Sequence, residues 1–212
     1  MKTFVAVPCM DQVSCKFAQS LVNLDRVGLM SFNFSESSLV YDSRNKLAQA
    51  AVGEGSDYVL WLDSDMVFKP SLLRDLMDAI EGRDFVTAIA FRRRPPFTPA
   101  LWAAVRMGLD PSENLNAEFA ELPEGVFEIE GSGLACCLMR TEVIKAVIDK
   151  YHAVFDPLPG YGEDLSFCIR ARGCGYKLHA ASGIRVGHMA TTIVTEDTWK
   201  AWNGGTNNAR KG

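Results

Sequence analysis

The segment from Asp57 to Leu62 (Asp-Tyr-Val-Leu-Trp-Leu) constrains the fold most strongly, because it is a near-continuous run of apolar residues. A strand with apolar side chains on both faces belongs to the centre of a sheet that helices cover on each side. The run stops at Asp63-Ser64-Asp65, where polar residues end the buried stretch. The chain is therefore predicted to form an α/β fold around a mostly parallel sheet.

The rest of the chain alternates short apolar runs with segments of helical periodicity, which is typical of one α/β domain. Strands are predicted where apolar and β-branched residues cluster, at 3–7, 29–34, 57–62, 84–91, 127–129, 134–139, 177–181 and 184–186. Helices are predicted from apolar spacing and capping residues, at 13–24, 46–52 (with Asp42 and Ser43 as caps), 70–80, 141–150 and 162–172. Residues 92–116 contain three consecutive arginines and four prolines, so this region is predicted to be rich in loops, with an apolar patch around Trp102.

The composition is that of a globular protein, since 48% of the 212 residues are hydrophobic and 23% are charged. The net charge of −4 argues against a general affinity for nucleic acid or for an anionic membrane. The sequence has no apolar run of about 18 residues and no signal-peptide pattern, so we expect no transmembrane helix and a cytoplasmic location. The six cysteines form no Cys-X-X-Cys pair and are expected to be free thiols.

Asp63 and Asp65 are the first candidates for chemistry, because they directly follow the buried strand. Their spacing lets both side chains point the same way as the chain turns, and ligands of open α/β sheets bind outside the carboxyl ends of strands. Two carboxylates there repel each other unless a cation or hydrogen-bond donors offset their charge. Oxygen ligands suit Mg²⁺ or Mn²⁺. The alternative is that Asp63 caps a turn and Asp65 is merely solvated.

Glu163 and Asp164 follow Gly160-Tyr161-Gly162 at the start of a predicted helix. Acids are expected there on structural grounds, because they interact favourably with the helix dipole. The two glycines also let the backbone place an acid at a cleft, where a carboxylate removes a proton from an acceptor hydroxyl. His188 is one of three histidines. It is either structural or exposed, or it partners a carboxylate around Mn²⁺.

These segments, in this order, resemble a GT-A glycosyltransferase of the family 2 kind. The resemblance is carried by Val7-Pro8-Cys9-Met10-Asp11, Ser43-Arg44-Asn45, Leu62-Asp63-Ser64-Asp65 (the DxD motif), Gly131-Ser132-Gly133 as a turn, Gly162-Glu163-Asp164 and His188. It spans roughly residues 3–189. It implies a GT-A (nucleotide-diphospho-sugar transferase) fold, with a mixed, mostly parallel central sheet flanked by helices. One domain would cover residues 1–190, followed by a tail at 191–212.

The resemblance also implies roles for individual residues. Pro8, Met10 and Asp11 would cradle the nucleotide base, with Arg44 near the nucleotide. Within the DxD motif, which includes Ser64, Asp63 would approach the ribose or sugar and Asp65 would bind Mn²⁺ or Mg²⁺ together with His188. Asp164 would be the base, with Glu163 as its substitute, and inversion at the anomeric carbon would follow. The acceptor would lie near Gly131, Ser132, Gly133 and Arg92.

Two further segments leave alternatives open. Arg92-Arg93-Arg94 is either a solvated basic loop or a grip for phosphate on a donor, a sugar phosphate or a nucleic acid. The tail at 191–212, with Trp199 and Trp202, is either mobile or a lid over the donor site.

The resulting hypothesis is a metal-dependent glycosyltransferase that uses a nucleotide diphosphate sugar, with UDP as the default. A nucleotidyltransferase acting on sugar phosphates is one alternative, although Pro8-Cys9-Met10-Asp11-Gln12 differs from the glycine-rich basic loop of that class. A catalytically inactive module that binds nucleotide sugars is the other. The sequence identifies neither the acceptor nor the oligomeric state.

Overall fold

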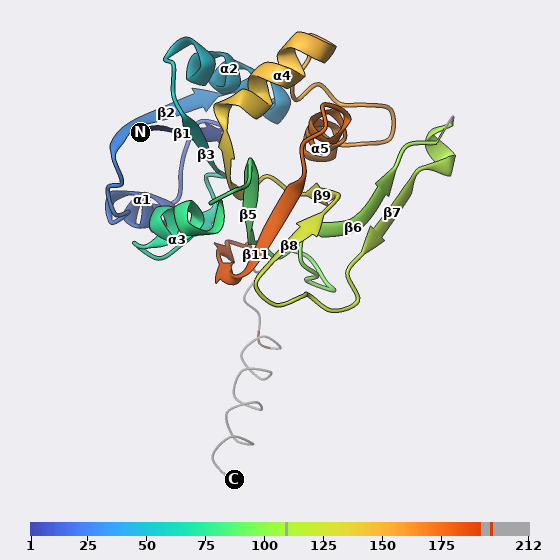
Figure 1. Ribbon diagram of the computed structural model, residues 1–212. Coiled ribbons are helices and arrows are strands. Elements are labelled where there is room, and N and C mark those ends of the chain that lie inside the picture. The colour runs from blue at the N-terminus through green and yellow to red at the C-terminus, as the bar shows by residue number, and fades with distance from the viewer. Residues whose placement is uncertain (109, 192–195, 197–212) are drawn as a thin grey trace.

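The computed structural model describes residues 1–108, 110–191 and 196, and its centre is a seven-stranded sheet (Figure 1). From one edge to the other the strands are β2 (Leu29–Glu36), β1 (Lys2–Cys9), β3 (Tyr58–Leu62), β10 (Cys136–Arg140), β5 (Phe85–Ile89), β11 (Leu178–Arg185) and β8 (Val126–Ile129). Strands β2, β1, β3, β5 and β11 run in one direction, while β10 and β8 are antiparallel to their neighbours. The predicted mixed, mostly parallel sheet is confirmed.

Helices cover both faces of this sheet, as the apolar run at 57–62 predicted. Helices α2 (Val40–Gly53), α4 (Thr141–Tyr151) and α5 (Glu163–Gly173) lie on one face, and α1 (Cys15–Val22) and α3 (Leu72–Ala79) lie on the other (Figure 1). Alternate residues of β3 enter the two cores: Val59 and Trp61 pack under the first group, and Leu60 and Leu62 under the second. All four side chains are fully buried.

A second, three-stranded sheet projects beside the first and corrects the prediction for residues 92–116. It consists of β7 (Leu115–Glu118), β6 (Leu101–Arg106) and β9 (Gly131–Ser132), with the short 3-10 helix η1 (Pro111–Glu113) between β6 and β7. The expected loop-rich character is therefore wrong for residues 101–106, which form β6, and for residues 115 and 116, which begin β7. The predicted turn at Gly131-Ser132-Gly133 is also wrong, because Gly131 and Ser132 pair with β6 as a strand.

Several boundaries differ from the predictions. Helix α2 begins at Val40, so Asp42 and Ser43 lie inside it and do not cap it. The two strands predicted at 177–181 and 184–186 are one strand, β11, with an irregularity after Ala181. Two short strands, β4 (Met66–Val67) and β12 (Gly187–His188), were not predicted and pair with each other. No helix of the described residues is long and apolar enough to cross a membrane.

The six cysteines, all in the described part of the chain, are free thiols, and Cys136, Cys137 and Cys168 are buried. Of the predicted tail, only residues 191 and 196 are described, so its proposed roles and the tryptophans at 199 and 202 lie outside the described residues.

Candidate active site

The carboxyl ends of the parallel strands meet at one edge of the central sheet, and a pocket of about 320 Å³ opens there. Its position follows from topology, because the loops after parallel strands gather at the same edge. Among the predicted site residues, the pocket is lined by Pro8, Met10, Arg44, Asp63, Ser64, Asp65, Glu163 and His188. Residues far apart in the sequence thus share one cavity of a size suited to a small ligand.

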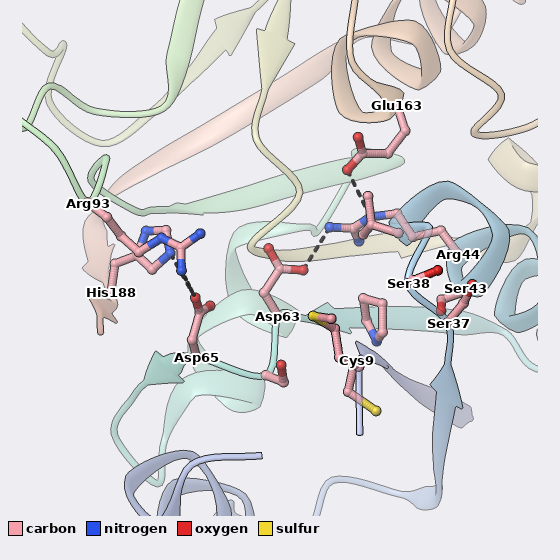
Figure 2. Close-up of a pocket in the computed structure, with 14 residues that line it drawn as sticks. Cys9, Ser37, Ser38, Ser43, Arg44, Asp63, Asp65, Arg93, Glu163 and His188 are labelled. Carbon is pink, nitrogen blue, oxygen red and sulfur yellow. Dashed lines mark hydrogen bonds and ion pairs between the residues drawn. The ribbon is translucent and has the colours of Figure 1, made fainter. Parts of the chain in front are cut away.

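Asp65 and His188 lie next to each other at one side of this pocket (Figure 2). The Nε2 atom of His188 lies 3.3 Å from Oδ2 of Asp65. The two short strands that went unpredicted produce this contact: β12 pairs with β4 at His188 and Met66, and the Met189 N–H donates to the Asp65 carbonyl. Asp65 comes just before β4, so the pairing holds the two side chains together.

The two side chains offer ligands that fit a divalent cation. Nδ1 of His188 lies 2.8 Å from the Phe91 carbonyl oxygen, which can only accept a hydrogen bond. In a neutral imidazole the proton is therefore on Nδ1, and the lone pair of Nε2 points toward the Asp65 carboxylate. A nitrogen and an oxygen ligand at this separation suit Mn²⁺, and the carboxylate oxygen also suits Mg²⁺.

The protein ligands for such a cation are few. Among the described residues, no group of three or more His, Cys, Asp or Glu side chains is placed to hold a metal ion. Magnesium in proteins is commonly held by one or two carboxylates together with the phosphates of a bound substrate. The pair formed by Asp65 and His188 fits an ion that a ligand helps to coordinate.

Arg93 also reaches this position and was not among the predicted site residues. Its Nη1 donates to Oδ2 of Asp65 at 2.9 Å, the same oxygen that faces His188 (Figure 2). The guanidinium supplies the positive charge that the Asp65 carboxylate requires in this arrangement. The sequence did single out the arginine triplet, but nothing in it separates Arg93 from its two neighbours.

Arg44 forms the buried centre of the other half of the pocket. Its side chain is 2% exposed and comes from α2, where it lies over the Trp61 ring at 5.6 Å. Its Nη2 donates to Asp63 Oδ1 at 2.7 Å, and its Nε lies 3.6 Å from Oε1 of Glu163 (Figure 2). Arg44 therefore joins the DxD motif to the start of α5.

The hydrogen-bonding capacity of Arg44 is not exhausted by these contacts. Nε and Nη1 are buried and have no hydrogen-bond partner. Buried polar groups in native proteins are rarely left without one, so unpaired donors point to a missing ligand or water. The neighbouring Asn45 has a structural role instead, because its side chain bonds the Phe155 N–H and the Asp156 carboxylate.

Asp164 occupies a smaller cavity of about 170 Å³ that shares Arg44, Asp63, Glu163 and His188 with the pocket. Burial, reinforced by the negative charge of Glu163, raises the pKa of Asp164 to about 6. Its Oδ1 accepts a hydrogen bond from the Leu165 N–H. A carboxyl group that titrates near neutral pH is suited to accept and return a proton.

The predicted acceptor-side residues separate into two groups. Gly133 and Arg92 line the cavity of Asp164. Gly131 and Ser132 do not, because both are buried in β9 and the Ser132 hydroxyl bonds the Thr87 side chain and the Gly133 carbonyl. Neither residue is exposed to that cavity.

The predicted base-binding segment is brought to the pocket in part. Pro8 and Met10 line it together with Cys9, whereas Asp11 is exposed and is not among the lining residues. Ser37 and Ser38 also line the pocket and were missed. Both follow β2 at the same edge of the sheet, so applying the strand-end rule to this strand would have found them.

The sequence model described as "Glycosyl transferase family 2" matches residues 32–148, a region that contains Arg44 and the DxD motif but ends before Glu163, Asp164 and His188. A search of curated proteins returned no match.

Solved structures share the fold. A197 from STIV is 19% identical with a TM-score of 0.63, and the alignment covers 89% of this chain and 86% of that one. GalNAc-T7, solved with UDP, GalNAc and Mn²⁺, is 12% identical with a TM-score of 0.60, covering 91% of this chain and 44% of that chain. TarS 1-349 from S. aureus is 15% identical with a TM-score of 0.55, covering 89% and 60%. The predicted GT-A fold is confirmed.

Proposed function

The chain belongs to glycosyl transferase family 2, and we propose that it transfers a sugar from a nucleoside diphosphate to an acceptor hydroxyl with the help of a divalent cation held by Asp65 and His188. The observation that carries the proposal is the convergence of this pair with Arg44 on one pocket at the carboxyl edge of the sheet. Family membership sets aside the nucleotidyltransferase alternative.

The leaving diphosphate is the first requirement of the reaction. When the bond between the anomeric carbon and the phosphate oxygen breaks, negative charge grows on the diphosphate, and bound Mn²⁺ or Mg²⁺ would stabilise that charge. Arg44 contributes a second positive charge, and its Nη1, which has no hydrogen-bond partner, is a donor for a bound anion. Asp65 and His188 position the cation, and Asp63 holds the Arg44 guanidinium while facing the sugar.

The nucleoside end of the donor is assigned to the far side of the same pocket. Pro8 and Met10 line it there and are proposed to contact the base, together with Ser37 and Ser38. Asp11 stays part of the proposed base-binding loop on the resemblance alone. UDP is the nucleotide to test first, since GalNAc-T7 was solved with UDP and Mn²⁺.

Asp164 is proposed as the base. Its carboxylate takes the proton of the acceptor hydroxyl as that oxygen forms a bond to the anomeric carbon, while the diphosphate leaves with the electron pair of the broken bond. Attack from the face opposite the leaving group would invert the anomeric configuration, and NMR that shows retention in the product would contradict this. Glu163 is the substitute candidate, but its contact with Arg44 favours a positioning role.

The decisive experiment measures thermal unfolding with a panel of nucleoside diphosphates, with and without Mn²⁺. A ligand that binds the native state raises the melting temperature by mass action, so one nucleotide should respond more strongly when Mn²⁺ is present. Asp65→Ala should abolish the part of the shift that depends on Mn²⁺. Asp78→Ala, at an exposed position on α3, is the matched control and should behave like the wild type.

Enzymatic transfer is tested separately from binding by release of nucleoside diphosphate from the matching nucleotide sugar. Slow hydrolysis of the donor in the presence of Mn²⁺ is expected. Saturable nucleotide binding without any donor turnover would instead identify an inactive binding module. An unchanged Mn²⁺ response in Asp65→Ala would remove Asp65 from the metal site.

A further inference from the structure

A groove of about 700 Å³ lies beside the active site, between the loop that carries Arg92, Arg93 and Arg94 and the segment around His188. We propose that this groove binds a phosphate group of the acceptor, so that the substrate receiving the sugar is a small phosphate monoester. The inference rests on the proposed function, because it assigns the acceptor of that same reaction.

The loop is anchored at its base, which makes it a defined surface. The backbone closes through hydrogen bonds from the Arg92 N–H to the Thr98 carbonyl and from the Ala100 N–H to the Ala90 carbonyl, both 2.9 Å long. The Arg92 side chain pairs with Glu118 and lies over the Trp102 ring at 5.4 Å. Arg93 and Arg94 extend from this anchored base, and both are exposed.

The charges of the loop are incompletely compensated. Arg92 has Glu118 as its partner and Arg93 has Asp65, but in the described part of the chain the Arg94 side chain has no hydrogen bond and no ion pair. A cation bound by Asp65 would also take over the carboxylate that now holds Arg93, leaving two guanidinium groups for a ligand. A phosphate monoester carries close to two negative charges and several acceptor oxygens, which matches two guanidinium groups better than a carboxylate does.

The groove lies where an acceptor would extend. His188 lines the donor pocket, the cavity of Asp164 and the groove, and Arg92 lines the last two. An acceptor whose hydroxyl reaches Asp164 would therefore pass Arg92 and His188 and place its other end among the arginines. The diphosphate of the donor has its own partners at Arg44 and the proposed cation, whereas Arg94 lines the groove and does not line the donor pocket.

A small ester fits this surface better than a nucleic acid does. Polyanion binding depends on several cationic contacts spread along a backbone, whereas this basic cluster is confined to one loop of a protein with a net charge of −4.

The test is a binding measurement with glucose 6-phosphate as the probe, on protein first saturated with Mn²⁺ and the nucleoside diphosphate found in the thermal panel. Calorimetry should detect glucose 6-phosphate and should detect neither glucose nor glucuronic acid at the same concentrations. Arg94→Ala should weaken the binding about tenfold to a hundredfold, the loss expected for a charge-assisted contact, and Arg94→Lys should weaken it less.

The control is Arg26→Ala, which removes an exposed arginine that precedes β2 at the opposite end of the sheet. It should bind glucose 6-phosphate like the wild type. The melting-temperature shift with nucleotide and Mn²⁺ should be unchanged in Arg94→Ala, which separates this inference from the proposed function.

Each of the following outcomes would overturn the inference. These are no binding of glucose 6-phosphate to the saturated protein, binding that Arg94→Ala leaves intact, equal binding of glucuronic acid, or a weakened nucleotide response in Arg94→Ala, which would assign the loop to the donor. Binding of a short oligonucleotide through Arg94 in place of the ester would also overturn it. If donor binding itself is absent, the proposed function fails first.

Discussion

Asp65 is the residue on which two positive groups compete. The Arg93 guanidinium bonds the same oxygen that faces His188, so Arg93 would have to give up this contact if Asp65 and His188 held a divalent cation. Loss of the ion pair between Arg93 and Asp65 requires free energy, and this free energy lowers the affinity for the metal. The observed contact is thus an internal competitor of the proposed cation.

We therefore predict that Arg93→Ala binds Mn²⁺ more tightly than the wild type, because the competing charge is gone. An exposed ion pair contributes about 0.2–1 kcal/mol, which corresponds to an increase of up to about fivefold in affinity. Electron paramagnetic resonance of free Mn²⁺ measures this directly. Arg93→Lys should keep most of the competition. Weaker Mn²⁺ binding in Arg93→Ala would show that the arginine supports the ion.

The rate of transfer should depend on the ionisation of Asp164. Because burial and Glu163 raise the pKa of Asp164 to about 6, the carboxylate required of a base prevails above that pH and is lost below it. We expect kcat/KM to fall about tenfold per pH unit below about pH 6. Initial rates between pH 5 and pH 8 at saturating Mn²⁺ test this, and a flat profile would contradict it.

Substitutions distinguish the two acids of this segment. Asp164→Asn should lower kcat about a hundredfold to ten-thousandfold, the usual contribution of a general base. Glu163→Gln should keep the acidic limb of the pH profile, because Asp164 still titrates. The reverse pattern, with the limb lost in Glu163→Gln, would transfer the role to Glu163.

The elements around the site are held together by close packing at β9. A Cβ atom added to Gly131 would lie 2.6 Å from Leu165 Cδ2 and 2.9 Å from Val105 Cγ2, so β9 is wedged between β6 and the first turn of α5. Gly131, which was predicted to lie near the acceptor, is instead required for the close approach of β9 to β6 and α5. It fixes where Glu163 and Asp164 begin α5.

Gly131→Ala should accordingly destabilise the fold by about 1–3 kcal/mol, the usual cost of overpacking a core. Chemical denaturation followed by circular dichroism provides the measurement. Gly53→Ala is the matched control, because its added Cβ meets nothing within 4 Å and alanine favours the helix. It should leave stability unchanged or raise it slightly. Equal stability of Gly131→Ala and the wild type would show that the junction can relax.

The elements that were missed share a physical cause. Residues 101–106 read Leu-Trp-Ala-Ala-Val-Arg, where the two alanines hide the alternation of buried and exposed positions in β6. Strands β4 and β12 contain two residues each and form only because they pair with each other. More than a hundred residues of chain separate them. Local patterns carry no information on such pairings.

At the scale of the whole molecule, the central sheet was predictable because its strands are runs of apolar and β-branched residues, which indicate burial directly. The site was predictable only to the level of residue type. The run at 57–62 located the DxD motif, His188 stood out as a candidate partner of a carboxylate, and the family resemblance added Arg44. The contacts of Asp65 with His188 and Arg93 depend on how distant loops meet at the sheet edge, which no single segment specifies.

Ionisation of Asp164 lowers the stability of the folded protein, and the size of this effect depends on pH. The pKa of Asp164 is about 6 in the folded protein and ordinarily 3.8, so the folded state binds a proton more readily than the unfolded one. Stability therefore falls as pH rises from about 4 to about 6 and stays reduced above that. The ionised form of Asp164, which lowers stability, is also the form that the proposed role as a base requires.

Asp164→Asn removes this ionisation and should be more stable than the wild type at pH 8 by about 1–3 kcal/mol, while the difference should vanish near pH 4. The asparagine Oδ1 can still accept the hydrogen bond from Leu165. Urea denaturation at both pH values provides the measurement, with Asp78→Asn on the exposed side of α3 as the control that changes neither. Asp164→Asn should therefore gain stability and lose transfer activity together. Equal stabilities of the variant and the wild type at pH 8 would mean that the Asp164 carboxylate is solvated in the folded state, and that burial does not raise its pKa for proton removal.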